Sequence, residues 1–301
     1  MLSLTLVLVT SIFARGGDQA ASTPTTSGPS VAPSSPDVRY GLFDWLDKRS
    51  VYGQGVYPEP FLVDDSDGET NEARLDWFHT GGPGNQHSDN IHGEVEKGFG
   101  PLTLELETAW ERDSSNGQIS SGMDNVDLGA RCPFYEYVSC DGNIDTAFGT
   151  AIEVGIPTHT QISHNTEVVP KLFNDLQLYH DFTLQSIIGY SMLLGDGGDG
   201  TTGGLQTFEY GFVFGYTIEH EKLAIPGLQQ LIPVFEFNGG KELNQANPGH
   251  DELTGDVGFR ANLDAIGPIQ PRLGIVFVFP IDNGASQSQT WGIDTSLIFE
   301  Y

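Results

Sequence analysis

The sequence predicts an all-β protein, a transmembrane antiparallel up-and-down β-barrel of about twelve strands. Three observations carry this prediction. Apolar and polar residues alternate with a period of two over most of the chain after Glu72, which is the signal of a strand. The alternating segments are about 9–15 residues long, which suits a tilted membrane strand better than the usual 5–6 residues of a soluble sheet. The connections between them alternate between short and long.

The composition narrows the class of protein. The 301 residues include 41 Asp and Glu against 13 Lys and Arg, which gives a net charge of −28. This balance excludes electrostatic binding of nucleic acid, because such binding needs a basic surface. It also argues against docking on anionic lipid. The mean hydropathy of −0.22 excludes a multi-pass helical membrane protein, but not a barrel, in which only alternate residues face lipid.

The N-terminal residues 1–21 are predicted to be a signal peptide. The apolar run from Leu2 to Phe13 is too short to span a bilayer as a helix and suits the apolar region of an export signal. No Lys or Arg precedes it, so the true start and the cleavage site stay open, and a buried N-terminal strand is the alternative. Residues 22–36, rich in Ser, Thr and Pro, are predicted to be a disordered linker.

Residues 37–71 are predicted to be a periplasmic segment that precedes the barrel. The stretch contains Trp45, Phe61 and several Tyr, and is therefore too aromatic for a simple linker. We expect it to cap the periplasmic mouth of the barrel, to enter the lumen as a plug, or to bind a partner.

Residues 72–301 are predicted to form the barrel. In the segment from Phe208 to His220, aromatic and aliphatic side chains occupy one face and Glu, Gly, Val and Thr occupy the other. A helix would place Glu and Phe on every face, and each interior Gly would cost it about 1 kcal/mol. The predicted strands lie near 72–80, 91–99, 102–112, 122–134, 144–157, 168–182, 184–195, 206–220, 229–239, 252–264, 270–281 and 290–301.

The connections and the C-terminus indicate an outer-membrane location. Short turns alternate with long polar loops such as GGPGNQHSDN and DSSNGQISSG, as do the periplasmic turns and external loops of outer-membrane barrels. An even strand number also places both ends of the barrel in the periplasm. The closing LIFEY, ending on Tyr301, is similar to the signal that the barrel-assembly machinery recognises in known outer-membrane proteins. A soluble β-sandwich is the alternative, since it too would bury one face of each strand.

If the apolar face meets lipid, the charged face lines the lumen. A twelve-strand lumen is narrow, and Asp and Glu rings favour cations. The alternative is that these carboxylates only solvate a water-filled interior and pair with the few bases. Inward glycines, among them Gly211, Gly215 and Gly274, would leave room in the lumen or ease strand curvature. The predicted lumen-lining residues are Glu94, Glu96, Glu105, Glu107, Glu111, Asp127, Glu153, Asp175, Glu209, Glu219, Glu236, Asp256, Arg260, Arg272 and Asp294.

Other motifs add little chemistry. Cys132 and Cys140 are predicted to form a disulfide, because the chain reads as exported and the two residues are close in sequence. The acidic run from Asp64 to Glu69 lacks the spacing of a calcium loop and is predicted to be a turn. No G-x-S-x-G, Walker loop or metal-binding motif is present, so we expect no enzyme, no catalytic residue, no bound metal and no cofactor.

The barrel region resembles a known family. The stretches EVEKGFGPLTLELE, VDLGARCPF, GTAIEVGIPT and GIVFVFPIDNG, with the closing WGIDTSLIFEY, are similar to the outer-membrane proteins labelled "MetA-pathway of phenol degradation". The resemblance implies a barrel that moves hydrophobic or aromatic compounds, and it supplies no catalytic or ligand-binding residues. We therefore expect a channel for small molecules with outer-membrane lipid around it. The alternative is a closed structural or adhesive barrel that acts through its external loops.

Overall fold

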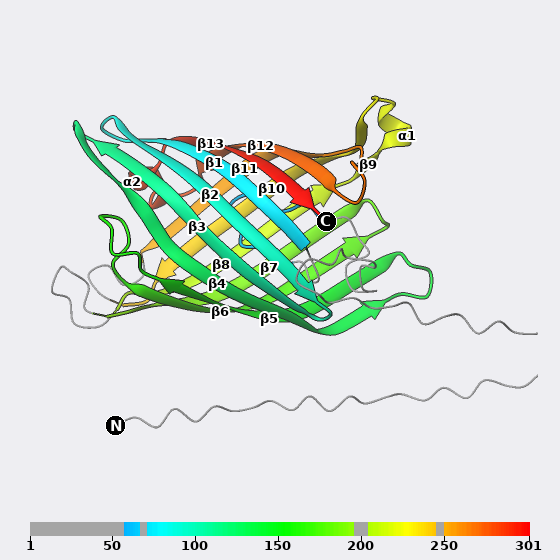
Figure 1. Ribbon diagram of the computed structural model, residues 1–301, viewed down its shortest axis with the longest axis horizontal. Helices are drawn as coiled ribbons and strands as arrows, with labels where there is room; N and C mark the ends of the chain where they lie inside the picture. The colour runs from blue at the N-terminus through cyan, green and yellow to red at the C-terminus, as the bar shows by residue number, and fades with distance from the viewer. Residues whose placement is uncertain (1–56, 67–70, 196–203, 245–249) are drawn as a thin grey trace, which may run out of the picture. The chain divides into compact units, whose positions relative to one another are not determined.

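The computed structural model describes residues 57–66, 71–195, 204–244 and 250–301, and its strands close into one antiparallel barrel (Figure 1). The predicted signal peptide and linker lie outside the described residues, as does most of the segment 37–71. The strands are β1 (Asn71–Gly82), β2 (Gln86–Phe99), β3 (Leu102–Ser115), β4 (Gln118–Val138), β5 (Ile144–Ile156), β6 (Thr166–Leu178), β7 (Phe182–Leu194), β8 (Gln206–Tyr216), β9 (Ile218–Glu219), β10 (Leu228–Glu242), β11 (Asp251–Leu263), β12 (Gln270–Pro280) and β13 (Trp291–Glu300).

The wall of the barrel contains twelve strands. Each strand pairs with the next along the chain, and β13 pairs with β1 to close the ring. The short β9 continues β8 beyond Thr217, and both pair with β10, so the two count as one strand of the wall. This closed antiparallel barrel confirms the predicted fold class, and every predicted strand overlaps an observed one.

The two ends of the barrel differ. β1 begins and β13 ends at the same end, where the Tyr301 N–H donates to the Asn71 carbonyl (2.8 Å); we call it the terminal end. The short helix α1 (His220–Leu223) lies there too. The opposite loop end carries the connections after β1, β3, β5, β7, β10 and β12, with the helix α2 (Ala285–Ser288) in the last of them (Figure 1).

Two of the connections predicted as long loops are tight turns, so that part of the prediction is wrong. β1 and β2 meet at residues 83–85, and β3 and β4 meet at Asn116 and Gly117. Both Asn116 and Gly117 have positive φ (52° and 79°), the backbone that a two-residue hairpin turn requires. The strands of these hairpins continue beyond their apolar part into polar residues. This is possible because cross-strand pairing satisfies the backbone N–H and C=O groups whether or not lipid surrounds the strands.

The outer face of the barrel is apolar. Large hydrophobic side chains, most of them with exposed fractions near 40–50 %, project from every long strand except β10, while their sequence neighbours turn inward. Phe212 on β8 is 38 % exposed, whereas Val213 beside it is completely buried. Exposed apolar surface of this extent marks a membrane-facing or partner-facing surface. Among the described residues, no helix is long and apolar enough to cross a membrane.

The predicted disulfide is not formed. Cys132 lies inside β4, where it pairs with Thr150 of β5, and Cys140 lies in the turn beyond the end of the same strand. An extended strand rises about 3.3 Å per residue, so the stretch between the two cysteines separates them by roughly 20 Å. A disulfide needs Cα atoms within about 7 Å of one another. The residues between the two cysteines form the end of β4, and not the closed loop that their spacing suggested.

Candidate functional site

The structure places most of the predicted lumen residues inside the barrel. Glu94, Glu96, Asp175, Glu236, Asp256, Arg260, Arg272 and Asp294 are buried there with at most 5 % exposure. Glu105, Glu107, Glu153 and Glu209 line a cavity within the same lumen. Three predicted residues belong to neither of these two sets. Glu111 accepts from the Asn90 side chain (2.8 Å) toward the loop end, Asp127 adjoins Gly155 on β5, and Glu219 pairs with Gln230 at the terminal end.

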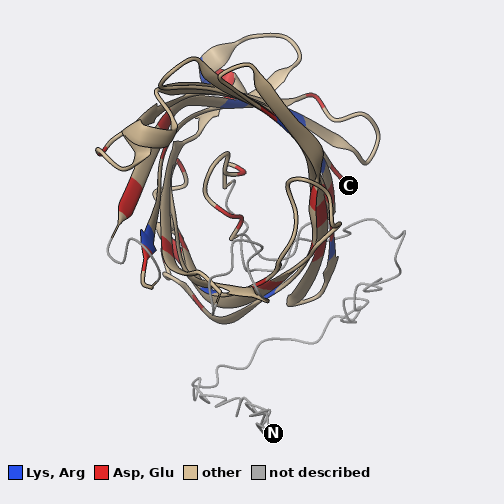
Figure 2. Ribbon diagram, turned by 90° about the vertical axis from the view of Figure 1, so that its left-hand side faces the viewer, with Lys and Arg blue, Asp and Glu red and all other residues tan. Residues whose placement is uncertain are grey.

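A stretch of chain that precedes β1 lies inside the barrel. Residues 57–66, which we call the lumen segment, loop through the middle of the ring when it is viewed from the loop end (Figure 2). Tyr57, Glu59, Phe61, Val63 and Ser66 of this segment are all buried, with exposed fractions of 8 % or less. The segment therefore fills the centre of the barrel between walls that the alternating pattern made polar.

Glu236 on β10 holds the middle of the lumen segment. Its carboxylate accepts the backbone N–H groups of Phe61 (2.9 Å), Leu62 (3.0 Å) and Val63 (3.2 Å). Asn238, two residues farther along the same face of β10, donates to the Leu62 carbonyl (2.8 Å). Hydrogen bonds that involve an ionised partner are about twice as strong as neutral ones, so these contacts fix a backbone that has no sheet partner of its own.

Three arginines hold the first half of the lumen segment. Arg260 on β11 donates to the carbonyls of Glu59 and Pro60 (both 2.7 Å), and Arg74 on β1 also donates to the Pro60 carbonyl (2.8 Å). Arg272 on β12 donates to the Glu59 carboxylate (2.9 Å). The Arg260 guanidinium lies over the Phe61 ring, 3.7 Å from its centroid, which adds a cation–π contact.

The second half of the lumen segment contacts the opposite wall. Ser66 donates to Asp175 on β6 (2.6 Å), Asp65 accepts from Arg131 on β4 (3.0 Å), and Asp64 pairs with Lys171. These contacts involve the acidic run that the sequence predicted to be a turn. They use its carboxylates as partners for bases of the barrel wall.

Glycines of the wall make room for the lumen segment. A Cβ atom on Gly211 would lie 2.4 Å from Val63, and one on Gly274 would lie 2.5 Å from the Phe61 ring. One on Gly215 would lie 2.8 Å from Pro58. Of the two explanations for inward glycines, the structure supports space in the lumen at these three positions, since any side chain there would collide with the segment.

Apolar contacts also hold the lumen segment in place. Val63 packs with Phe173, Ile187, Val213, Ile232 and Val234 in one buried cluster. Phe61 packs with Val276 and Val278 in a second, against which Leu62 and Phe78 are placed. The lumen segment is thus held both by charged hydrogen bonds and by two apolar clusters on different sides of the barrel.

A cavity of about 690 Å³ lies above the lumen segment, toward the loop end; we call it the vestibule. Its wall along β1, β2, β3 and β5 is acidic, and its wall along β6 and β7 carries Val169 and Ile187. The permanent cations in the lining are Arg74 and Lys171. The acidic residues of the lining are Asp64, Asp65, Asp76, Glu94, Glu105, Glu107, Glu153, Glu167, Glu209, Glu242, Glu252 and Asp294.

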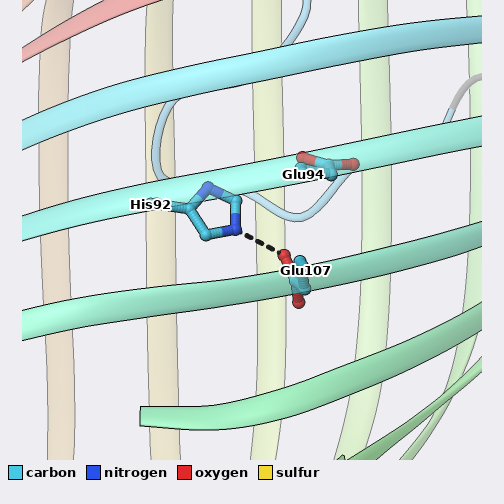
Figure 3. Close-up of side chains that lie close together, drawn as sticks. All are labelled: His92, Glu94 and Glu107. Atoms are coloured by element: carbon cyan, nitrogen blue, oxygen red, sulfur yellow. Dashed lines mark hydrogen bonds and ion pairs between the residues drawn. The ribbon is translucent and has the colours of Figure 1, made fainter. Parts of the chain in front are cut away.

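One group in the acidic wall has spacing that suits a metal ion. His92, Glu94 and Glu107 offer ligand atoms that lie within 4.8 Å of one another (Figure 3). However, His92 Nε2 already contacts Glu107 (2.8 Å), and its Nδ1 faces Asp76 (3.5 Å). Arg74 lies 3.8 Å from Glu94. Because these contacts account for all three side chains, we assign no metal to this group.

Glu59 is a titratable group of the lumen segment whose pKa is clearly perturbed. Burial raises the pKa of its carboxyl to about 7, and the nearby Asp65 adds to the increase, whereas Arg272 opposes it. Glu59 belongs to the lumen segment and not to a strand of the wall. Its seating is therefore sensitive to protons near neutral pH.

Sequence reasoning missed the partners of the lumen segment. The residues 57–66 were assigned to a mouth cap or plug as one of several alternatives, and Gln185, which donates to the Pro58 carbonyl (2.6 Å), was not singled out. The available signals were the aromatic content of this stretch and the glycines spaced along one face of β8. Neither signal identifies which residues, more than a hundred positions apart in the chain, contact each other.

Comparisons with known proteins define the fold. No family model matches the sequence, and no curated protein matches it closely enough to count as a relative. Among solved structures, the COG4313 outer membrane channel from Pseudomonas putida F1 aligns with 82 % of this chain and 100 % of its own, at 12 % identity and a TM-score of 0.52. The NanC porin aligns with 76 % of this chain and 98 % of its own (8 % identity, TM-score 0.46). The β domain of the Bordetella autotransporter BrkA covers 78 % and 100 % (11 % identity, TM-score 0.45).

The alignment with the COG4313 channel shows a similar fold. The TM-scores of the other two alignments are too low to support a conclusion. A closed antiparallel barrel with an apolar outer face satisfies every backbone group inside a bilayer. This closed barrel and its similarity in fold to the COG4313 channel together confirm the predicted location in the outer membrane.

Proposed function

We propose that this protein is an outer-membrane channel for small molecules in which the lumen segment serves as a movable plug. The observation that supports the proposal most directly is the contrast between the two halves of the lumen. The vestibule is open toward the loop end, whereas the lumen segment occupies the centre below it. Its seat consists mainly of hydrogen bonds and ion pairs to side chains, which can exchange with water if the segment moves.

The class of solute is part of the proposal. Carboxylates dominate the vestibule and favour cations over anions. Apolar side chains from the lumen segment and from β6 and β7 line the same cavity, which supports passage of molecules with a hydrophobic or aromatic portion. The resemblance to the phenol-degradation family points the same way. We retain residues 1–21 as the proposed export signal and β13 as the proposed contact for the barrel-assembly machinery.

A reversible cross-link tests whether the plug moves. The Val63 Cβ atom lies 3.1 Å from the position of a Cβ on Gly211, close to the spacing of about 3.5–4.5 Å across a disulfide. The pair Val63→Cys and Gly211→Cys would be made in a Cys132→Ser, Cys140→Ser background and refolded into planar bilayers. We expect single-channel conductance to be low after oxidation and to rise when a reductant is added.

Each result has a definite meaning. The single variants Val63→Cys and Gly211→Cys in the same background are the controls, and their conductance should not respond to reductant. Equal conductance of the oxidised and reduced double variant would show that solute passes without movement of the segment. If conductance is absent in both states, and also after deletion of residues 57–66, the barrel is closed. The structural or adhesive function would then replace the channel.

A further inference from the structure

Asp294 lines the vestibule without a partner. Asp294 is only 3 % exposed, and its Oδ1 atom is buried without a hydrogen-bond partner among the residues that the structure describes. A buried carboxylate in this state is costly unless a cation or a donor meets it. The neighbouring cations Arg74 and Arg260 act on Asp294 only from a distance, because Arg74 contacts Asp76 and the Pro60 carbonyl and Arg260 contacts the Glu59 and Pro60 carbonyls.

Apolar side chains lie on one side of this carboxylate, whose charged neighbours are Asp76, Glu236, Asp256, Arg74 and Arg260. Asp294 on β13 is paired directly with Phe78 on β1, and side chains opposite each other in an antiparallel pair lie about 5 Å apart. The Phe78 ring leans over Gly292, where a Cβ would come within 2.9 Å of it. Phe61 and Leu62 of the lumen segment belong to the same cluster and also line the vestibule.

An organic cation satisfies both features at once. An ammonium group would form an ion pair with Asp294 in a place from which water is largely excluded, and aromatic faces attract cations. The apolar portion of the same molecule would rest on Phe61, Leu62 and Phe78. A cavity of about 690 Å³ has the size of a small-molecule site. Glu242 and Glu252 at the loop end of the lining would concentrate cations at the entrance.

We propose that the vestibule is a binding site for organic cations that join an ammonium group to an apolar or aromatic body, with the ammonium at Asp294 and the body on Phe61 and Phe78. This inference names the substrate class of the proposed channel and therefore rests on the proposed function. An inorganic cation would gain nothing from the apolar side of the site, so the two kinds of ligand can be told apart.

Binding to the refolded full chain in detergent tests the inference without any need for conductance. The probes are 2-phenylethylammonium, the neutral 2-phenylethanol and the anionic 3-phenylpropionate, measured by titration calorimetry. We expect the ammonium to bind and the other two to bind at least about tenfold more weakly, because they lack the charge-assisted contact. Asp294→Asn should weaken binding of the ammonium by about tenfold or more. Asp141→Asn, the same change in the exposed turn between β4 and β5 at the terminal end, is the matched control and should change it little.

A second variant keeps the inference falsifiable if Asp294→Asn does not fold. Phe78→Leu keeps the volume apolar but removes the aromatic face, and should weaken the ammonium by about threefold while leaving 2-phenylethanol unchanged. Equal binding of the ammonium and the alcohol would overturn the inference, as would equal losses in Asp294→Asn and Asp141→Asn. Because binding and conductance are separate measurements, a channel that conducts without binding the ammonium would refute the inference and keep the proposed function. A barrel that binds it but never conducts would refute the channel alone.

Discussion

Single side chains decide how the lumen is filled. Alternation along β10 predicts Glu236 on the inner face, since a strand directs every second side chain to the same side, and Glu236 is fully buried. It did not reveal what Glu236 binds, because the N–H groups that it accepts lie more than 170 positions earlier in the chain. The same is true of Gly211 and Gly274. Their positions in the strands were evident, but only the folded chain shows that Val63 and Phe61 occupy the space they leave.

Glu59 makes the seating of the lumen segment depend on pH. Its pKa is raised to about 7 in the docked segment, compared with 4.5 for a free carboxyl, mainly because it is buried. The docked state therefore binds a proton more tightly than the released state. This contribution to docking is fully present below pH 4.5 and is lost as the pH rises through about 7. At 1.36 kcal/mol per unit, the effect is on the order of 3 kcal/mol.

The rate of thiol labelling measures this effect. Val63→Cys, in the background without Cys132 and Cys140, should react with a maleimide-type reagent faster at pH 8 than at pH 5, after correction for the reactivity of a free thiol. Asp65, Glu72, Glu96, Arg260 and Arg272 also face Glu59 and contribute their own charges. Addition of Glu59→Gln, which keeps an acceptor for Arg272, should remove most of the pH dependence. An unchanged pH dependence in that variant would mean that another group controls docking.

At the scale of elements, the strands were predictable and some of their ends were not. A period of two over at least nine residues is a strong signal, and the register that it implies holds for β8, where Phe212 faces outward and Val213 inward. The ends of β1 to β4 at the loop end were missed because their residues are polar and resemble loops. The Asn116–Gly117 pair was a signal for a hairpin turn that the loop interpretation overlooked. The cysteine pair was misjudged because β4 continues past Cys132 to Val138, so that extended chain and not a closed loop separates the two residues.

The outward register of β8 has a measurable consequence. Phe212 lies in the middle of the strand on its lipid face, so Phe212→Arg should lower the free energy of unfolding from liposomes by about 2–4 kcal/mol. Tyr216→Arg, at the end of the same strand and on the same face, should cost only about 0–1 kcal/mol. Urea titrations of both variants give the comparison. Equal costs at the two positions would place the membrane differently along the strand.

At the scale of the whole molecule, closure of the barrel follows from the strand count, but the content of the lumen does not. Twelve alternating strands predict a polar interior and an apolar exterior, and both are observed. Nothing in that pattern specifies that a segment before β1 turns back into the ring. Side chains that hold the lumen segment come from seven strands, so this binding site exists only after the wall has closed. The strands are β1, β4, β6, β7, β10, β11 and β12.

The charge of the whole lumen predicts the selectivity of the open channel. When the plug is released, as in the reduced Val63→Cys, Gly211→Cys protein, ions pass a vestibule in which acids far outnumber bases. The reversal potential in a KCl gradient should therefore show preference for K⁺ over Cl⁻. The preference should fall as ionic strength rises, because the Debye length shortens from about 10 Å at 0.1 M to about 3 Å at 1 M.

Neutralising the acidic wall identifies the source of that preference. Glu105, Glu107 and Glu153 offer carboxylate oxygens within 4.8 Å of one another in the vestibule, so their joint replacement by Gln should move the K⁺/Cl⁻ permeability ratio toward unity. Glu221→Gln on α1, which is outside the barrel wall at the terminal end, changes the total charge without touching the vestibule and should leave the ratio unchanged. If the two replacements lower the ratio equally per charge removed, selectivity reflects the net charge of −28 over the whole chain and not the lumen. A channel that prefers Cl⁻ would contradict an acidic path altogether, because no arrangement of these carboxylates attracts anions.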